Sequence, residues 1–587
     1  MKLPIFWNKR QIPDINVVPD WYIILGWIDA SNYDVTYRNE DFLVVKTQAV
    51  KSHNSRFIVV GDIWLSNRSH LLQLLQLNEK DTDKEIVAHL WEIKGEESLN
   101  LLEGMFSLCV WDNKERHLYL VRDGVGCRTL YYTNSGNISV IAPRLATLLP
   151  FHSQQLDLVA LRDYLCCGFV PGEQTLWQNV RELSVGMVLQ IESCGEEINY
   201  VSESLFWQAR ENIQNAEESL IWHGKQLRQL LDKVVQEYLP IDEPVGVYLS
   251  GGLDSSCITA LAAKFHNHPV HTYSIHFGEN CPNELEFSGL VAQHCKTQHS
   301  ILEITPNDMW SKLPQVMSYL DDPIGDPLTV PNYLLGKIAR ENAGVILNGE
   351  GGDPCFGGPK NQPMLLDRLY NGIKNTEENL VTNYVNSFKK CSSYLPQLLK
   401  REVFTKVKEK DFVFADYLYR NESYLNRLMT INIKFKGADH ILTKVNNMTV
   451  ANNLEGRSPL FDRRVVEMAM QIPPQYKLAG AQEKAVLKQA VLDLLPREII
   501  ERPKSGMMVP VQYWFKQLWQ RRAKSLLLNR NAEIAPLLNQ ELIKQWLNYR
   551  GDAWQRYGVK LWLLVSLEIW LQVQKGHRGL ENKIPAD

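Results

Sequence analysis

The sequence predicts two domains of different fold class: an α+β front half with antiparallel sheets, and an α/β back half with a parallel sheet and many helices. The length of 587 residues is too great for a single hydrophobic core. Up to about residue 200, short runs rich in Val, Ile and aromatic residues alternate with turn residues. After residue 243, a strand, a helix and a second strand follow one another closely, which is typical of a parallel sheet.

In the front half, the apolar runs predict strands over residues 21–28, 42–47, 57–60, 106–111 and 117–121. Residues 85–94 are expected to form a helix. The polar stretch 210–219 reads as a linker leading into a helix. We therefore assign residues 1–208 to the first domain and 209–587 to the second.

In the back half, apolar residues at helical spacing predict a helix over residues 221–238. Strands are expected at 244–249, 270–277 and 345–347, with a helix at 255–265. Beyond residue 365 the pattern is mostly helical. The apolar stretch 561–573 contains Ser566, Glu568 and Gln572 and is shorter than the roughly 20 residues of a membrane span. It predicts a buried helix.

The composition excludes several classes of function. A net charge of -4 and a pI near 6.4 give no basic surface for nucleic acid. The N-terminus has no apolar stretch of the kind found in signal peptides. The ten cysteines include no C-x-x-C pair, which is typical of reduced thiols, and Cys166 and Cys167 are expected to be buried. The sequence thus predicts a cytoplasmic protein that binds neither nucleic acid nor membrane.

A glycine turn at the end of the predicted strand 244–249 points to phosphate binding. Ligands of open α/β sheets sit at the carboxyl ends of the strands. Glycines let the backbone approach a phosphate, and the first N–H groups of the following helix point towards it. Asp254 would repel phosphate unless a bridging Mg²⁺ lay between them. The alternative is a plain turn whose Asp and Ser residues cap the helix. The run comprises Leu249, Ser250, Gly251, Gly252, Leu253, Asp254, Ser255 and Ser256.

A second strand end favours the phosphate interpretation. The predicted strand 345–347 leads into Gly349, Glu350, Gly351, Gly352 and Asp353. Two glycine-lined strand ends, each with an aspartate, are what binding of Mg²⁺-pyrophosphate at two points requires. ATP and Mg²⁺ are therefore the expected substrate and cofactor.

These two loops resemble those of the asparagine synthetase family, whose synthetase domain has the PP-loop ATP pyrophosphatase fold, an adenine nucleotide alpha hydrolase-like fold. Further segments agree in the family's order: 272–277, 320–327, 448–462, 483–488 and 502–510. At the front, segments 102–107, 121–132 and 169–172 resemble the family's Ntn-type glutaminase domain, an antiparallel sandwich.

The resemblance implies roles for individual residues. Asp254 and Asp353 would bind the metal, and Lys504 would stabilise charge on the phosphates or the tetrahedral intermediate. Glu455 would lie near the substrate's nucleophile, or else form an ion pair with Arg457. Lys484 would be catalytic, or else a solvated helix residue. The residues implied to bind ATP or pyrophosphate are Leu249, Ser250, Gly251, Gly252, Asp254, Ser255, Ser256, Ser274, Gly349, Glu350, Gly351 and Gly352.

The front half departs from the glutamine-hydrolysing members. Those carry a catalytic Cys directly after Met1, whereas Lys2 stands here and the first cysteine is Cys109. Residues 61–68 also differ from the family's glutamine-binding segment. Since a thiolate is needed to attack the glutamine amide, we expect no ammonia from this domain.

An amide ligase without its own ammonia source is expected to use an amine already present in the substrate. Lasso-peptide macrolactam cyclases and β-lactam synthetases are family members of this kind, and residues 61–68 resemble the cyclases most. Residues 354–360 depart from the synthetases, which argues against plain aspartate as the substrate.

The leading hypothesis is macrolactam closure through an acyl-adenylate, with release of AMP and pyrophosphate. The substrate would be a peptide or small-molecule carboxylate with its own amine, and a leader-binding protein and a leader peptidase would be partners. The rivals are an ammonia-dependent asparagine synthetase, another small-molecule amide or β-lactam synthetase, and a non-catalytic scaffold.

Overall fold

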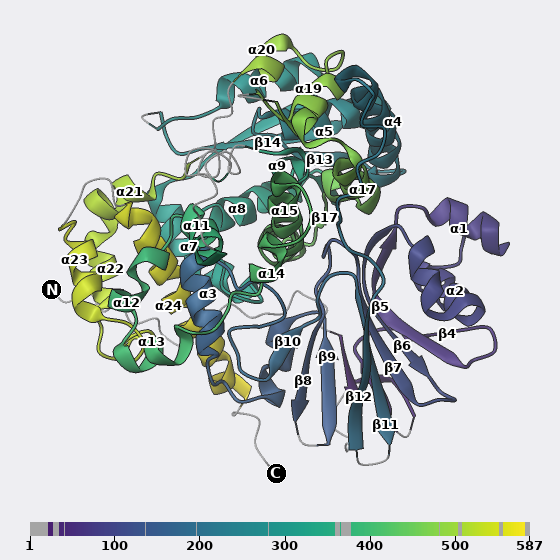
Figure 1. The fold of residues 1–587 in the computed structure, drawn as a ribbon, viewed down its shortest axis with the longest axis horizontal. Helices are drawn as coiled ribbons and strands as arrows, with labels where there is room; N and C mark the ends of the chain where they lie inside the picture. Colours follow the sequence, from purple (N-terminus) through teal and green to yellow (C-terminus); the bar gives the residue numbers. More distant parts are fainter. Residues whose placement is uncertain are drawn as a thin grey trace.

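The computed structural model describes residues 21–26, 34–39, 41–135, 137–194, 197–279, 281–358, 364, 377–479, 482–502, 508–550 and 556–581. The sheets of the front half lie together at the lower right of Figure 1, and the parallel sheet of the back half lies above them. Helices from the end of the chain gather on the left, beside α3 (Leu158–Cys167) of the front half.

The front half contains two six-stranded sheets in which neighbouring strands pair antiparallel. The first has the order β10 (Val180–Glu182), β8 (Tyr131–Ser135), β9 (Ile138–Ala142), β1 (Tyr22–Leu25), β3 (Phe42–Val45), β2 (Val35–Arg38). The second has the order β12 (Glu197–Leu205), β11 (Met187–Cys194), β7 (His117–Arg122), β6 (Gly104–Asp112), β5 (Phe57–Leu65), β4 (Val50–Lys51).

These two sheets form a sandwich because each strand turns alternate apolar side chains inwards. The shared core takes Ile23 and Val44 from the first sheet and Ile58 and Trp111 from the second, all nearly free of solvent contact. The rings of Phe42 and Trp111 stack at 5.2 Å between centroids. The outer face of the second sheet is covered by α2 (Asp83–Lys94). The predicted antiparallel sandwich and the helix at 85–94 are confirmed.

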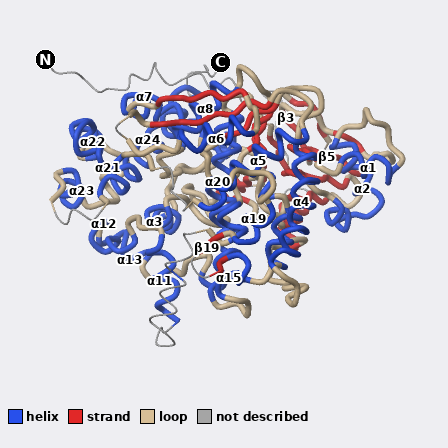
Figure 2. Tube along the Cα trace, turned by 90° about the horizontal axis from the view of Figure 1, so that it is seen from above, coloured by secondary structure: helices blue, strands red, loops and turns tan. Residues whose placement is uncertain are grey.

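The back half is built on a parallel sheet with the order β15 (Gln298–Glu303), β14 (Val270–His276), β13 (Val245–Tyr248), β16 (Val345–Leu347), β17 (Glu455–Arg457). The connection from β13 to β14 is α5 (Leu253–Phe265), as predicted. The predicted helix at 221–238 is α4 (Leu220–Tyr238), which lies beside α19 (Ala485–Ala490) in both views (Figures 1 and 2). The α/β class of this half is confirmed.

The remaining helices lie around these sheets, and several from the end of the chain form the left side of Figure 1. In the front half they are α1 (Arg68–Leu75), η2 (Gly95–Leu101) and η3 (Leu145–Phe151). In the first part of the back half they are α6 (Leu285–His294), α7 (Pro306–Tyr319), α8 (Thr329–Ala339) and α9 (Gly352–Phe356). The last part contains α11 (Glu377–Ser387), η6 (Ser392–Tyr394), α12 (Leu395–Leu398), α13 (Arg401–Val407), α14 (Ala415–Leu418), α15 (Tyr424–Ile431), η7 (Asn432–Leu442), α16 (Thr443–Val450), η8 (Pro459–Phe461), α17 (Arg463–Gln471), α18 (Pro474–Lys477), α20 (Arg497–Glu501), α21 (Val511–Trp514), η9 (Phe515–Trp519), α22 (Gln520–Leu527), α23 (Gln540–Leu547) and α24 (Tyr557–Glu581), with a two-stranded ribbon of β18 (Leu478–Ala479) and β19 (Gln482–Glu483).

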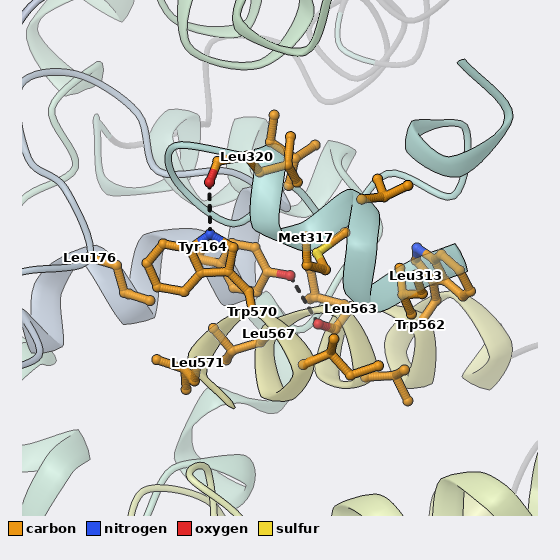
Figure 3. Close-up of a cluster of buried hydrophobic side chains, with 14 of the residues drawn as sticks. Tyr164, Leu176, Leu313, Met317, Leu320, Trp562, Leu563, Leu567, Trp570 and Leu571 are labelled. Atoms are coloured by element: carbon orange, nitrogen blue, oxygen red, sulfur yellow. Dashed lines mark hydrogen bonds between the residues drawn. The ribbon is translucent and has the colours of Figure 1, made fainter. Parts of the chain in front are cut away.

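The apolar stretch 561–573 lies within α24, and residues 561–571 are buried, as predicted. Figure 3 shows this helix packed against α7 and α3, so it joins the front half to the back half. The Tyr164 hydroxyl donates to the Leu563 carbonyl at 2.9 Å, and the Trp570 indole donates to the Leu320 carbonyl at 3.2 Å. None of the helices in the described ranges is long and apolar enough to cross a membrane. Cys166 and Cys167 are buried in α3, as predicted.

The Tyr164 hydroxyl gives a first test of this junction. Tyr164→Phe removes a buried hydrogen bond and keeps the ring, so it is expected to lower the free energy of unfolding by about 1 kcal/mol. Thermal unfolding would measure the change. Tyr513→Phe is the matched control, because that side chain is exposed and should leave the melting temperature unchanged. An unchanged melting temperature in Tyr164→Phe would contradict a contribution of this bond to the junction.

Candidate active site between two glycine loops

The first glycine loop follows β13 and is braced by its own serines. Gly252 caps α5, and the Ser255 hydroxyl donates to the Gly252 carbonyl at 3.2 Å. The Ser250 and Ser255 hydroxyls lie 3.1 Å apart. Ser274, on the neighbouring strand β14, donates to the Leu249 carbonyl at 2.5 Å. Local hydrogen bonds therefore hold the loop in one shape with the amino end of α5 open.

The second loop follows β16 and lies directly against the first. The Asn348 amide oxygen accepts from the Glu350 N–H at 3.0 Å and from the Ser458 hydroxyl at 2.9 Å, which fixes the turn. A Cβ on Gly349 would lie 2.4 Å from the Ser255 backbone nitrogen, so only glycine permits this approach. The structure thus brings the two predicted loops together.

A buried lysine joins the two aspartates. Lys484 Nζ lies 2.5 Å from Asp254 Oδ2 and 2.6 Å from Asp353 Oδ1. Its side chain is 3% exposed, and its backbone has a left-handed φ of 54°. Although burial alone would lower it, the pKa of Lys484 is raised because both carboxylates stabilise the charged form. The alternative of a solvated helix lysine does not fit this environment, because Lys484 is buried at the centre of the site.

The two aspartates are suited to a magnesium ion shared with phosphate. Asp254 Oδ1 is buried without a hydrogen-bond partner. In the described ranges, no cluster of three or more His, Cys, Asp or Glu side chains could hold a metal by itself. Mg²⁺ takes one or two carboxylates and completes its octahedron with phosphate oxygens and water. The residues therefore fit an ion that arrives with ATP.

Both loops open into one cavity of about 400 Å³, which we call the loop pocket. Five cationic side chains face it from separate elements and could bind the phosphates of a nucleotide, and six carboxylates also line it, among them Asp254 and Asp353, which could bind a metal ion. The Arg502 guanidinium donates to the Gly251 carbonyl at 3.1 Å and pairs with Glu284. The cations that line it are Lys436, Lys444, Lys484, Lys488 and Arg502.

Of the predicted binding residues, most line the loop pocket: Leu249, Ser250, Gly252, Asp254, Ser255, Ser274, Gly349, Glu350, Gly351 and Asp353. Gly251, Ser256 and Gly352 do not line it. Ser256 is fully buried, and Gly251 and Gly352 belong to loop backbone that packs closely against neighbouring residues. Lys504 lies outside the described residues.

Glu455 stands apart from the loop pocket. It is the first residue of β17, and its carboxylate lies 2.6 Å from Arg457 Nε. The Arg457 guanidinium in turn lies over the ring of Trp64 in the front half. The sequence left two interpretations of Glu455, a carboxylate near the substrate or an ion pair with Arg457. The geometry matches the ion pair, and Glu455 is not among the residues that line the loop pocket.

Sequence reasoning missed several residues of the pocket wall. Asp326 Oδ2 accepts from Lys444 Nζ at 2.6 Å, and His440 Nε2 lies 3.5 Å from the same oxygen. The segment 320–327 was singled out only through the family resemblance. Its charged partners come from η7 and α16, and no local pattern could pair residues more than 110 positions apart.

Gly352 provides a second test. A Cβ there would lie 2.2 Å from the Asp254 carboxyl carbon, so Gly352→Ala must displace the aspartate from Lys484. We expect ATP–pyrophosphate exchange to fall about 10- to 100-fold. Gly289→Ala is the matched control, since a Cβ there meets nothing within 4 Å and the residue lies in α6. Equal exchange in both variants would contradict the assigned position of Asp254.

The family model described as asparagine synthase matches residues 226–572, and that described as glutamine amidotransferase domain matches residues 46–203. Asparagine synthetase [glutamine-hydrolyzing] 1 of Bacillus subtilis is 24% identical, over 89% of this chain and 87% of its own length. A putative asparagine synthetase [glutamine-hydrolyzing] of Mycobacterium tuberculosis is 27% identical, over 74% of this chain and 71% of its own length. The Zea mays asparagine synthetase [glutamine-hydrolyzing] is 24% identical, over 90% and 77%.

Proposed function

This chain belongs to the asparagine synthase family, and from that premise we propose that it closes a macrolactam ring in lasso-peptide biosynthesis. At the level of the family it is an ATP-dependent ligase that forms C–N bonds, uses Mg²⁺ and releases AMP. The finer proposal is that the carboxylate and the amine belong to the same peptide. The observation that carries it is an intact loop pocket beside a front half in which Cys109, Cys127, Cys166 and Cys167 are buried.

The loop pocket would activate the carboxylate. The two glycine loops bind the phosphates of ATP, and the substrate carboxylate attacks the α-phosphorus to give an acyl-adenylate. Mg²⁺, held by Asp254 and Asp353, supplies charge neutralisation on the pyrophosphate when bound. Lys484, fixed between the two aspartates at 2.5 and 2.6 Å, keeps a positive charge next to the leaving group. A preorganised cation in a site with little water stabilises the charge that develops in the transition state.

The amine would come from the substrate, because the four front-half cysteines whose side chains the structure describes are not accessible as nucleophiles. Cys109, Cys127, Cys166 and Cys167 are all buried, and burial raises the pKa of the Cys109 thiol. Residues 61–68, which stand where the family binds glutamine, instead form an ion pair and a hydrogen bond within the front half. Asp62 pairs with Arg128 at 3.1 Å, and the Asn67 amide donates to the Leu101 carbonyl at 2.9 Å.

Ring closure inside one molecule suits a ligase without an ammonia supply. Holding both reacting groups on one enzyme turns a bimolecular step into an effectively unimolecular one, which can lower the barrier by about 7–11 kcal/mol. We further propose that a leader-binding protein and a leader peptidase deliver the peptide with a free amine.

A panel of carboxylates tests the proposal by ATP–pyrophosphate exchange. The panel contains synthetic peptides with a free N-terminus and an internal Asp or Glu, the same peptides with an acetylated N-terminus, and aspartate with ammonium. We expect exchange with both peptide sets and an amide product from the free amine only. The relatives' names favour asparagine synthetase as a second candidate, and asparagine formed from aspartate and ammonium would establish it instead. No exchange with any carboxylate would leave the scaffold hypothesis.

A further inference from the structure

A second cavity, of about 440 Å³, adjoins the loop pocket. We call it the side cavity. One part of its wall is apolar and aromatic, with Phe169 from the front half and Tyr384, Phe388 and Leu428 from the back half. The basic side chains of Lys389, Lys390, Lys436 and Arg556 also line it, and they favour the neutral form of an amine that enters. Asp326, Asn432, Lys436 and His440 line both cavities, so these four residues form a shared wall.

Three residues of the shared wall, Asn432, Lys436 and His440, lie on one continuous helical rod, in which η7 has π-helical winding between α15 and α16. Asn432, Lys436, His440, Lys444 and Met448 all line the loop pocket and are spaced four residues apart. Four residues overshoot one turn of an α-helix, which has 3.6, and fall short of the wider π turn. The mixed winding therefore keeps these side chains in one row, and π segments are frequent at functional sites.

His440 is the only imidazole of this row, and imidazole is the side chain that most often serves as a general base. Its ring stacks on Phe169 at 5.2 Å and 8°, which fixes its plane. Both ring nitrogens lack a hydrogen-bond partner, although Nε2 lies 3.5 Å from Asp326 Oδ2. The side chain is 16% exposed. An oriented imidazole with free nitrogens, backed by a carboxylate, is the arrangement of a base with its orienting group.

We propose that the side cavity receives the amine-bearing end of the substrate and that His440 accepts the amine's proton as the amide bond forms. This inference rests on the proposed function. The amine nitrogen bonds to the acyl carbon of the adenylate, one N–H proton passes to the imidazole, and the C–O bond to AMP breaks. The aromatic walls suit an apolar residue near the amine, as in a peptide segment, better than free ammonia.

The charges around His440 are consistent with this role. Asp326 stabilises the protonated ring, whereas Lys436, Lys444 and burial disfavour it, and the pKa of His440 falls to about 4. The imidazole is therefore neutral and able to accept a proton at neutral pH. The N–H becomes more acidic as the C–N bond forms, and the phosphates of a bound adenylate favour the imidazolium. Asp326 is a positioning residue in this account.

Three reactions of His440→Gln separate the proton transfer from activation. The substrate is the peptide of the panel that gives the fastest exchange. The three reactions are exchange, attack by the peptide's own amine to give the macrolactam, and attack by added hydroxylamine to give a hydroxamate. Hydroxylamine is uncharged at neutral pH. We expect macrolactam formation to be about 100-fold slower or more, and exchange and hydroxamate formation to fall far less than that. The lost activity should recover as the pH rises towards the ordinary pKa of an α-amine, about 7.7–8.0. His53→Gln, on the surface of the front half, is the control.

Ser387→Trp provides a second variant that leaves the imidazole in place. Ser387 lines the side cavity, so the indole should block the peptide's amine end and spare exchange and hydroxamate formation. Macrolactam formation at the wild-type rate in either variant would overturn the inference. So would a loss of all three reactions in His440→Gln, which would indicate a structural role. Absence of exchange in the wild type would overturn the proposed function itself.

Discussion

Asp254→Asn is expected to reduce ATP–pyrophosphate exchange about 100- to 1000-fold, because it removes one of the two charges that would hold Mg²⁺ against the phosphates. The neutral amide still fits beside Gly352 and can still accept a hydrogen bond from Lys484. Folding should therefore be retained. At saturating ATP, the variant should need a higher Mg²⁺ concentration than wild type to reach half of its maximal exchange rate.

The matched control for this variant is Asp242→Asn. Asp242 is exposed on the surface just before β13. Asp242→Asn makes the same chemical change and the same change in net charge as Asp254→Asn. The exchange rate and the Mg²⁺ dependence of this control should therefore equal those of wild type. Exchange in Asp254→Asn within threefold of this control would exclude Asp254 as a metal ligand.

Lys484→Met is expected to have an effect of similar size on exchange and, in addition, to make folding depend on Mg²⁺. Removing the cation leaves two carboxylates facing each other at a buried site, and breaking a buried ion pair costs about 3–5 kcal/mol. Mg²⁺ can replace the lost charge. The melting temperature of the variant should therefore rise with added Mg²⁺ much more than that of wild type.

The direction of the pKa shift fixes the pH range of this effect. Because the pKa of Lys484 is raised in the folded protein, its contribution to stability is fully present below the ordinary lysine pKa of about 10.4 and is lost only as the pH rises beyond it. The difference between wild type and Lys484→Met should thus be constant from pH 6 to pH 9 by thermal unfolding, within about 1 kcal/mol. Lys114→Met, a surface change, serves as the control. A melting temperature of Lys484→Met that does not respond to Mg²⁺ would contradict the shared site.

The sequence was most informative where local pattern and chemistry coincide. The βαβ unit at 244–277 and the glycines at 251–252 and 349–352 could be recognised because strand ends, helix starts and close backbone approach each have a residue signature. The same holds for α24, whose apolar run predicted a buried helix. The boundary between residues 208 and 209 and the role of Lys504 stay predictions.

What the sequence could not supply are the pairings between distant residues. Lys484 had two equal readings until its position between Asp254 and Asp353 was known, more than 130 residues away from either. Glu455 resembles a catalytic carboxylate in the family's pattern, yet β17 places it beside Arg457 and the front half. The row from Asn432 to Met448 depends on π winding, which no periodicity of 3.6 reveals.

The central claim is that one peptide provides both the carboxylate and the amine. The most direct measurement uses a peptide with a free N-terminus and heavy oxygen in its Asp or Glu side chain, incubated with ATP and Mg²⁺ in the absence of glutamine and ammonium. Mass spectrometry should find a peptide lighter by one water and AMP that carries one heavy oxygen. Formation of ADP, label in phosphate, or an amide that appears only when ammonium is added would contradict it.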